Sequence, residues 1–147
     1  MLKVLIAEDD LMIADIAEEM IVGYGYEVCG IARTVQEAVD LGRLHKPDLA
    51  LIDLRLADEG RGTDIVRQLG SREGLGVLYA SGNIEQFSLT ATDGHACLAK
   101  PYRSGDLERG LEIVARMVAT GIATPPFPPG FHVLPQATVP QPESSND

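Results

Sequence analysis

Side chains capable of phosphoryl-transfer chemistry follow four of the short apolar segments in this chain. They are two carboxylates after the first segment, one after the third, a hydroxyl at the end of the fourth and an amine after the fifth: Glu8, Asp9, Asp53, Ser81 and Lys100. Carboxylates on neighbouring strands are like charges at close range, so they must share a proton or bind a cation. A carboxylate beside a cation, a hydroxyl and an ammonium can carry a phosphoryl group, because each partner offsets charge that develops during transfer.

The acidic residues also predict which cation the site would take. Its expected ligands are carboxylates, and neither His nor Cys falls at these strand ends, so Mg²⁺ suits the site better than Zn²⁺. Gly82 leaves room for a phosphoryl group beside the chain, whereas Asp48 lies at the wrong end of its strand to accept one. Taken alone, the acidic triplet 8–10 before a helix is more often a helix cap. The prediction therefore depends on several strand ends meeting at one edge.

Alternating apolar and helical patterns predict the elements that would bring these residues together. Five apolar segments alternate with five helical patterns, which predicts an α/β fold: a doubly wound, five-stranded parallel sheet of flavodoxin-like order 2-1-3-4-5 with five helices. In such sheets ligands bind beyond the carboxyl ends of the strands, beside the switch point between strands 1 and 3. The predicted strands are residues 4–7, 28–32, 49–52, 77–80 and 97–99.

The predicted helices lie between and after these strands. Apolar residues recur with helical spacing over residues 13–20, 35–39, 65–69, 84–91 and 107–118. Stop and start signals accompany several of them. They are glycines after the first and third helices, a capping box before the second and a serine cap before the fifth: Gly23, Gly70, Thr34 and Ser104.

Length and charge limit what else the protein can be. The chain has 147 residues, 45% of them hydrophobic, which is enough for one domain with a buried core. With 22 acidic residues against 12 basic ones, its net charge of −10 argues against nucleic-acid binding, as does an aromatic content of 5%. No apolar stretch could span a bilayer and no signal peptide is recognisable. We therefore expect a cytoplasmic protein without membrane contact, whose Cys29 and Cys97 are reduced.

Proline content marks a boundary near Gly121. Seven of the nine prolines lie in the last 27 residues, which contain no Lys or Arg. Proline cannot continue a helix and favours extended backbone. We expect a domain over residues 1–120 and a proline-rich tail over residues 121–147. The tail is either disordered or docked on the domain through apolar residues such as Phe127, Phe131 and Leu134.

The motifs taken together resemble a known family. The runs VLIAEDD, PDLALIDLRL, VLYASG and CLAKPY, in this order over residues 1–120, resemble the receiver domain of two-component response regulators, in its stand-alone, CheY-like type. The resemblance implies that Asp53 accepts a phosphoryl group from a phosphohistidine in a Mg²⁺-dependent phosphorelay. It also implies the ligands of that Mg²⁺, namely Glu8, Asp9, Asp53 and the backbone carbonyl of Arg55.

Other residues gain expected roles from the same resemblance. Ser81 would be the switch hydroxyl, and Lys100 would pair with the phosphoryl group. Pro101 would follow a cis peptide bond. Arg55 and Asn83 match positions that tune the rate of dephosphorylation.

The partners that the resemblance implies are proteins. A sensor histidine kinase or a phosphotransfer protein would act upstream and an unidentified protein target downstream, while a homodimer stays open. The chain would be an enzyme only in the limited sense of catalysing its own phosphorylation and autodephosphorylation.

The sequence departs from the family pattern at two places. Cys97 stands where the family usually has an aromatic switch residue, three positions before the lysine, and the loop after Asp53 is longer and lacks the common proline. Both departures favour an alternative, a pseudo-receiver that has the same fold and binds partners without cycling phosphate. A phosphohydrolase is a second alternative, but aspartate-based phosphatases commonly need a second Asp two residues on, where this chain has Arg55. His95 is expected to be an exposed loop residue without a role.

Overall fold

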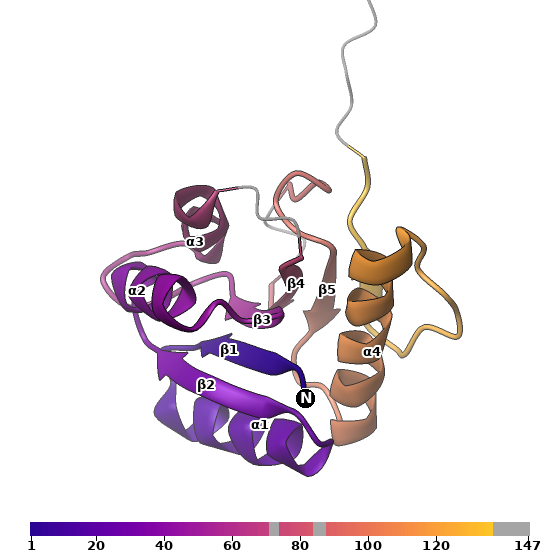
Figure 1. The fold of residues 1–147 in the computed structure, drawn as a ribbon, viewed down its shortest axis with the longest axis horizontal. Coiled ribbons are helices and arrows are strands. Elements are labelled where there is room, and N and C mark those ends of the chain that lie inside the picture. Colours follow the sequence, from indigo (N-terminus) through magenta and orange to yellow (C-terminus); the bar gives the residue numbers. More distant parts are fainter. Residues whose placement is uncertain (71–73, 84–87, 137–147) are drawn as a thin grey trace, which may run out of the picture.

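The computed structural model describes residues 1–70, 74–83 and 88–136. Strands and helices alternate along this part of the chain (Figure 1). Their order is β1 (Lys3–Ala7), α1 (Leu11–Gly23), β2 (Glu27–Ala32), α2 (Val35–His45), β3 (Leu49–Asp53), α3 (Gly62–Leu69), β4 (Gly76–Ser81), β5 (Ala96–Ala99), α4 (Ser104–Thr120) and β6 (Phe131–Val133).

The strands form one sheet with the order β2-β1-β3-β4-β5-β6. The first five strands are parallel, and β6 runs antiparallel to β5 at the edge. The doubly wound α/β class and the order of strands 1 to 5 are therefore confirmed. The sixth strand is a difference from the sequence prediction, which assigned no strand after residue 99.

Helices cover both faces of the sheet, α1 and α4 on one face and α2 and α3 on the other (Figure 1). Because side chains of a strand alternate between faces, β1 contributes Ile6 to the core under α1 and α4 and Leu5 to the core under α2 and α3. Leu111 of α4 and Ile65 of α3 are fully buried in these two cores. Packing on both faces fixes the strand ends relative to one another.

Two details of the helices differ from the sequence prediction. The expected helix over residues 84–91 begins on residues 84–87, which lie outside the described residues, and Ala91 belongs to a turn. Ser104 is the first residue of α4 rather than its cap. The backbone N–H of Arg103 donates to the Asp106 carboxylate at 3.3 Å, so an acidic side chain inside the first turn performs the capping.

The chain turns back after α4 and packs against the domain. Gly121 ends the helix in the left-handed conformation at φ 78°. The Arg109 guanidinium donates to the backbone carbonyls of Thr124 and Pro126, at 2.7 and 3.0 Å. The segment after α4 is therefore attached to the domain at Thr124 and Pro126, and residues 137–147 lie outside the described residues. Among the helices that the structure describes, none has the length and apolar character needed to cross a membrane.

Candidate functional site

The acidic residues gather where β1 and β3 end. Ala7 lies opposite Ile52 in the parallel register, so the next residues, Glu8 and Asp53, leave the sheet side by side. Glu8, Asp9 and Asp53 each offer a carboxylate oxygen within 4.8 Å of the others. The structure thus brings together the three carboxylates that were predicted to bind a metal ion. Their all-oxygen chemistry fits Mg²⁺.

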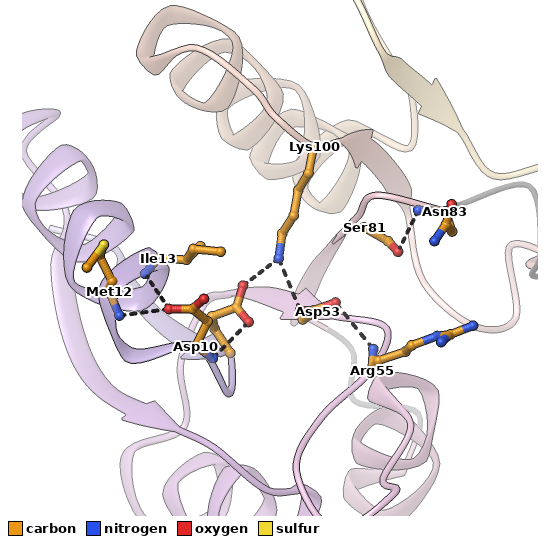
Figure 2. A network of polar contacts seen from close by, with 9 residues as sticks. Asp10, Met12, Ile13, Asp53, Arg55, Ser81, Asn83 and Lys100 are labelled. Atoms are coloured by element: carbon orange, nitrogen blue, oxygen red, sulfur yellow. Dashed lines mark hydrogen bonds and ion pairs between the residues drawn. The ribbon is translucent and has the colours of Figure 1, made fainter.

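Lys100 reaches this acidic cluster from the end of β5, which lies two strands from β3 and three from β1 (Figure 2). Its ammonium donates hydrogen bonds to Glu8 Oε1 at 2.5 Å and to Asp53 Oδ2 at 3.0 Å. All three side chains are mostly shielded from water, which strengthens these charge-assisted bonds. The peptide bond between Lys100 and Pro101 is cis, the isomer that the resemblance implied.

Burial and charge act against each other in this cluster. Burial is the main cause that raises the pKa of Glu8 to about 7, and Asp53 raises it further while Lys100 opposes the shift. Burial alone would lower the pKa of Lys100, but its bonds to Glu8 and Asp53 outweigh burial and raise that pKa. When all groups are ionised, three carboxylates face one ammonium. The excess negative charge is what a divalent cation would balance.

Asp10, the last residue of the acidic triplet, has a different task. Its Oδ1 accepts from the backbone N–H groups of Met12 and Ile13, at 3.0 and 3.3 Å, and so caps α1. The Asp10 N–H in turn donates to Glu8 Oε2 at 3.2 Å. The residues of the triplet therefore divide: Asp10 caps the helix, whereas Glu8 and Asp9 join the acidic cluster.

Ser81 ends β4, between the ends of β3 and β5. It is buried, and its Oγ accepts from the Asn83 N–H at 3.2 Å (Figure 2). The Lys100 N–H donates to the Ser81 carbonyl at 3.0 Å, which joins the ends of β4 and β5. Apart from the two chain neighbours of Gly82, no atom of the described residues lies within 4 Å of the place where a Cβ of this residue would be.

The loop after Asp53 folds back beside the carboxylate. The Arg55 N–H donates to Asp53 Oδ1 at 3.2 Å, and Arg55 pairs with Arg61 across a short antiparallel bridge. Gly62 then starts α3 so close to β3 that an added Cβ would collide with the Asp53 carbonyl oxygen and lie 2.6 Å from Ile52. Gly62 is a positioning residue that the sequence analysis missed. The sequence feature that could have identified it is a glycine at the end of the loop that follows Asp53.

Cys97, the atypical switch position, is buried beside a tyrosine. Tyr79 lies directly opposite it on β4 and is fully buried, and its hydroxyl donates to the Asp93 carbonyl at 2.7 Å. The aromatic side chain near this position thus comes from β4 rather than β5, which sequence reasoning did not anticipate. Both cysteines are free thiols.

His95 is not the exposed residue without a role that was predicted. It is half-buried, and its Nδ1 accepts from the Val77 N–H at 3.0 Å. Burial lowers its pKa. The prediction was wrong because His95, although it precedes β5, already lies beside Val77 at the start of β4. It is therefore not part of an exposed loop.

An apolar pocket adjoins the acidic cluster. Its volume is about 350 Å³, and it lies between α1 and the segment that follows β5. The lining residues are Ile13, Ile16, Met20, Lys100, Pro101 and Tyr102. Since Lys100 belongs to both, the pocket opens beside the site.

Comparisons with known proteins show the family and the fold to which this chain is similar. Residues 4–112 match the family model described as the response regulator receiver domain. The chain is 35% identical over 114 residues to the transcriptional regulatory protein PdtaR of Mycobacterium tuberculosis, covering 76% of this chain and 55% of that protein.

Two solved structures have similar folds. A CheY-like response regulator receiver domain protein from Methanospirillum hungatei has a TM-score of 0.72 and 26% identity, covering 83% of this chain and 99% of that chain. A mutant of the anti-anti-sigma factor PhyR from Bartonella quintana has a TM-score of 0.69 and 30% identity, covering 82% of this chain and 50% of that chain. The chain spans about half the length of PdtaR and of this PhyR.

Proposed function

Because the chain belongs to the response regulator receiver family, we propose that it accepts a phosphoryl group on Asp53 in a Mg²⁺-dependent reaction. The observation that carries the proposal is the arrangement around Asp53. The Lys100 ammonium bonds one oxygen of its carboxylate, and the carboxylates of Glu8 and Asp9 lie within metal-binding distance of the same side chain. An acceptor aspartate needs a cation and an ammonium together at one carboxylate, because both offset charge on the transferred group.

The proposed step is an in-line displacement at phosphorus. An oxygen of Asp53 attacks the phosphorus atom of a phosphohistidine, a P–O bond forms, and the P–N bond breaks with its electron pair left on the imidazole nitrogen. Lys100 donates to a phosphoryl oxygen, since its ammonium already lies 3.0 Å from Asp53. Ser81 offers a hydroxyl from the neighbouring strand, and the space beside Gly82 admits the group.

The residues present fit the expected Mg²⁺. Glu8, Asp9 and Asp53 would hold it with carboxylate oxygens, and the Arg55 carbonyl is a further expected ligand. When bound, Mg²⁺ supplies positive charge that stabilises the phosphoryl oxygens during transfer. The bond from the Lys100 ammonium to the buried Glu8 carboxylate orients the cluster before any donor arrives.

The surface beside the site suits a protein donor. On α1, Met12 and Ile16 are 73% and 48% exposed, and together they form an apolar face beside the acidic cluster. The apolar pocket continues this surface to Pro101 and Tyr102. We therefore assign the upstream partner, a histidine kinase or a phosphotransfer protein, to this face. We also propose that the downstream partner is a further protein. The chain would catalyse only its own phosphorylation and dephosphorylation, and it would do so in the cytoplasm.

Intact-mass measurement tests the proposal. The chain is incubated with acetyl phosphate and Mg²⁺, and the expected result is the addition of one phosphoryl group. The addition should disappear in Asp53→Ala and when EDTA removes the metal. An unmodified wild-type chain would favour the pseudo-receiver alternative.

A further inference from the structure

The C-terminal segment closes the outer edge of β5. The Ala99 N–H donates to the Gly130 carbonyl at 3.0 Å, the Leu134 N–H donates to the His95 carbonyl at 3.1 Å, and between them β6 pairs with β5. One residue further on, the Pro135 carbonyl accepts from the Ala91 N–H at 2.8 Å. The segment therefore runs along the whole of β5, from Ala99 at its end to His95, the residue before its start.

The same segment supplies one side chain to each core. Phe131 is 4% exposed and packs in the core under α4, whereas Leu134 is 6% exposed and packs in the opposite core with Tyr79 and Cys97. Cys97, which is 2% exposed, lies opposite His132 of β6. A hydrogen bond with the His132 backbone also opposes the rise that burial causes in the pKa of the Cys97 thiol. The segment is therefore part of what covers this thiol.

The domain carries features that accommodate this segment. Gly110 lies inside α4, where glycine is less favourable than alanine by about 1 kcal/mol. A Cβ there would lie 3.5 Å from the Phe131 ring, an ordinary contact distance, so the ring packs directly against α4 at this glycine. The neighbouring Arg109 holds the connecting loop through the carbonyls of Thr124 and Pro126.

The docked segment and the acidic cluster act on the same strand end. Ala99 is held by Gly130, and the next residue, Lys100, is held by Glu8, Asp53 and the Ser81 carbonyl. A phosphoryl group on Asp53 would give the Lys100 ammonium and the Ser81 hydroxyl new acceptor oxygens beyond the present carboxylate. A shift of the Lys100 backbone toward them would move Ala99 as well, because the two residues share a peptide bond.

We propose that residues 130–135 act as a clamp on β5 that is docked while Asp53 is unmodified and is released when Asp53 is phosphorylated. The inference rests on the proposed phosphorylation of Asp53. It assigns a conformational response to the C-terminal segment in a chain that has Cys97 in place of the aromatic switch residue. Release uncovers Cys97 and leaves the edge of β5 without a partner strand.

Thiol labelling in the full chain tests the clamp. Cys29→Ala leaves Cys97 as the remaining thiol, since the chain has two cysteines. In this background the rate at which a thiol reagent labels Cys97 should rise at least about fivefold after acetyl phosphate and Mg²⁺ are added, which is the low end of typical coupling between sites. The same treatment of Cys29→Ala with Asp53→Ala should leave the rate unchanged. Intact mass, read on the same samples, reports phosphorylation separately.

The two readouts distinguish failure of the clamp from failure of the proposed function. A phosphorylated chain whose Cys97 labelling rate is unchanged or lower overturns the clamp and leaves phosphorylation standing. A chain that never gains the phosphoryl mass overturns both.

Thermodynamic linkage between phosphorylation and docking supplies an independent test of the clamp. If phosphorylation disfavours docking, then a variant with weaker docking must favour phosphorylation, by at most the coupling factor between the two. Leu134→Ala, which removes a buried contact of the clamp, should raise both the basal labelling of Cys97 and the phosphorylated fraction at limiting acetyl phosphate. Val133→Ala, at an exposed position of the same segment, is the matched control. A merely structural role for Leu134 would not raise the phosphorylated fraction, and an unchanged or lower fraction contradicts the clamp.

Discussion

At the scale of single residues, the Lys100 ammonium holds the acidic cluster together. It bonds Glu8 and Asp53 at once, which puts a positive charge in direct contact with the carboxylate proposed to react. Replacing it with Lys100→Ala leaves the developing charge on the phosphoryl group without this donor. We expect the rate of phosphorylation by acetyl phosphate, followed by intact mass, to fall by about 10²-fold.

A second lysine provides the control for this variant. Lys46 follows α2 with φ 50°, at the opposite end of the sheet from the site. Lys46→Asn removes the same charge, and asparagine tolerates the left-handed conformation. It should react at the wild-type rate, and a wild-type rate in Lys100→Ala would contradict the assigned role.

His95 predicts how stability depends on pH. Burial lowers its pKa from 6.5, and its neutral Nδ1 accepts from the Val77 N–H. The unfolded chain therefore binds the proton first as pH falls, so stability is fully present above the ordinary pKa and is lost below it. Urea unfolding should show a larger loss for wild type than for His95→Asn between about pH 7 and about pH 5. Equal losses in the two proteins would argue against this histidine as the cause.

The residues of the site could largely be predicted because their chemistry is visible in their types. Glu8, Asp9, Asp53 and Lys100 are charged residues at the ends of apolar segments, and a parallel sheet has to bring those ends together. The role of Tyr79 could not be predicted, because a buried tyrosine inside an apolar run looks like any core residue until its hydroxyl partner on another segment is known.

At the scale of elements, the start of α3 sets the position of Asp53. Gly62→Ala would push a methyl group into the Asp53 carbonyl and the Ile52 side chain. We expect it to lower the free energy of unfolding by about 2 kcal/mol or more, measured by urea unfolding. Gly105→Ala, in the first turn of α4, meets no described atom within 4 Å and should be neutral or stabilising by up to about 1 kcal/mol. Equal effects of the two substitutions would contradict the close approach at Gly62.

The exposed face of α1 predicts a variant that separates protein donors from small ones. Ile16→Glu places a charge in the apolar surface beside Lys100. With a histidine kinase that phosphorylates the wild-type chain, transfer to this variant should fall by about tenfold or more. Its reaction with acetyl phosphate should continue, because a small donor needs no docking surface. Glu19→Ala, exposed on the same helix, is the control, and equal transfer to both variants would reject the docking face.

Elements with a local signal were predicted better than those that depend on distant contacts. The first five strands follow from short apolar runs, and Gly70 ends α3 as expected. The strand β6 has only three residues in a proline-rich segment, and it exists because β5 offers an open edge. Such an edge cannot be seen in the tail's own sequence.

At the scale of the whole molecule, the acidic character of the chain divides into two parts. Most of the net charge of −10 is spread over the chain, whereas three acidic residues meet within 4.8 Å at one edge of the sheet. Packing on both faces of the sheet holds that edge, and the C-terminal strand closes the side next to Lys100. The central proposal is therefore that Asp53 is a Mg²⁺-dependent phosphate acceptor.

Locating the phosphoryl group tests this proposal most directly. After reaction with acetyl phosphate and Mg²⁺, borohydride reduces an aspartyl phosphate to homoserine, and peptide mass mapping identifies the converted residue. We expect homoserine at position 53 in wild type, and no conversion when Mg²⁺ is withheld. Conversion at another carboxylate such as Asp9, or none at any residue, would contradict it.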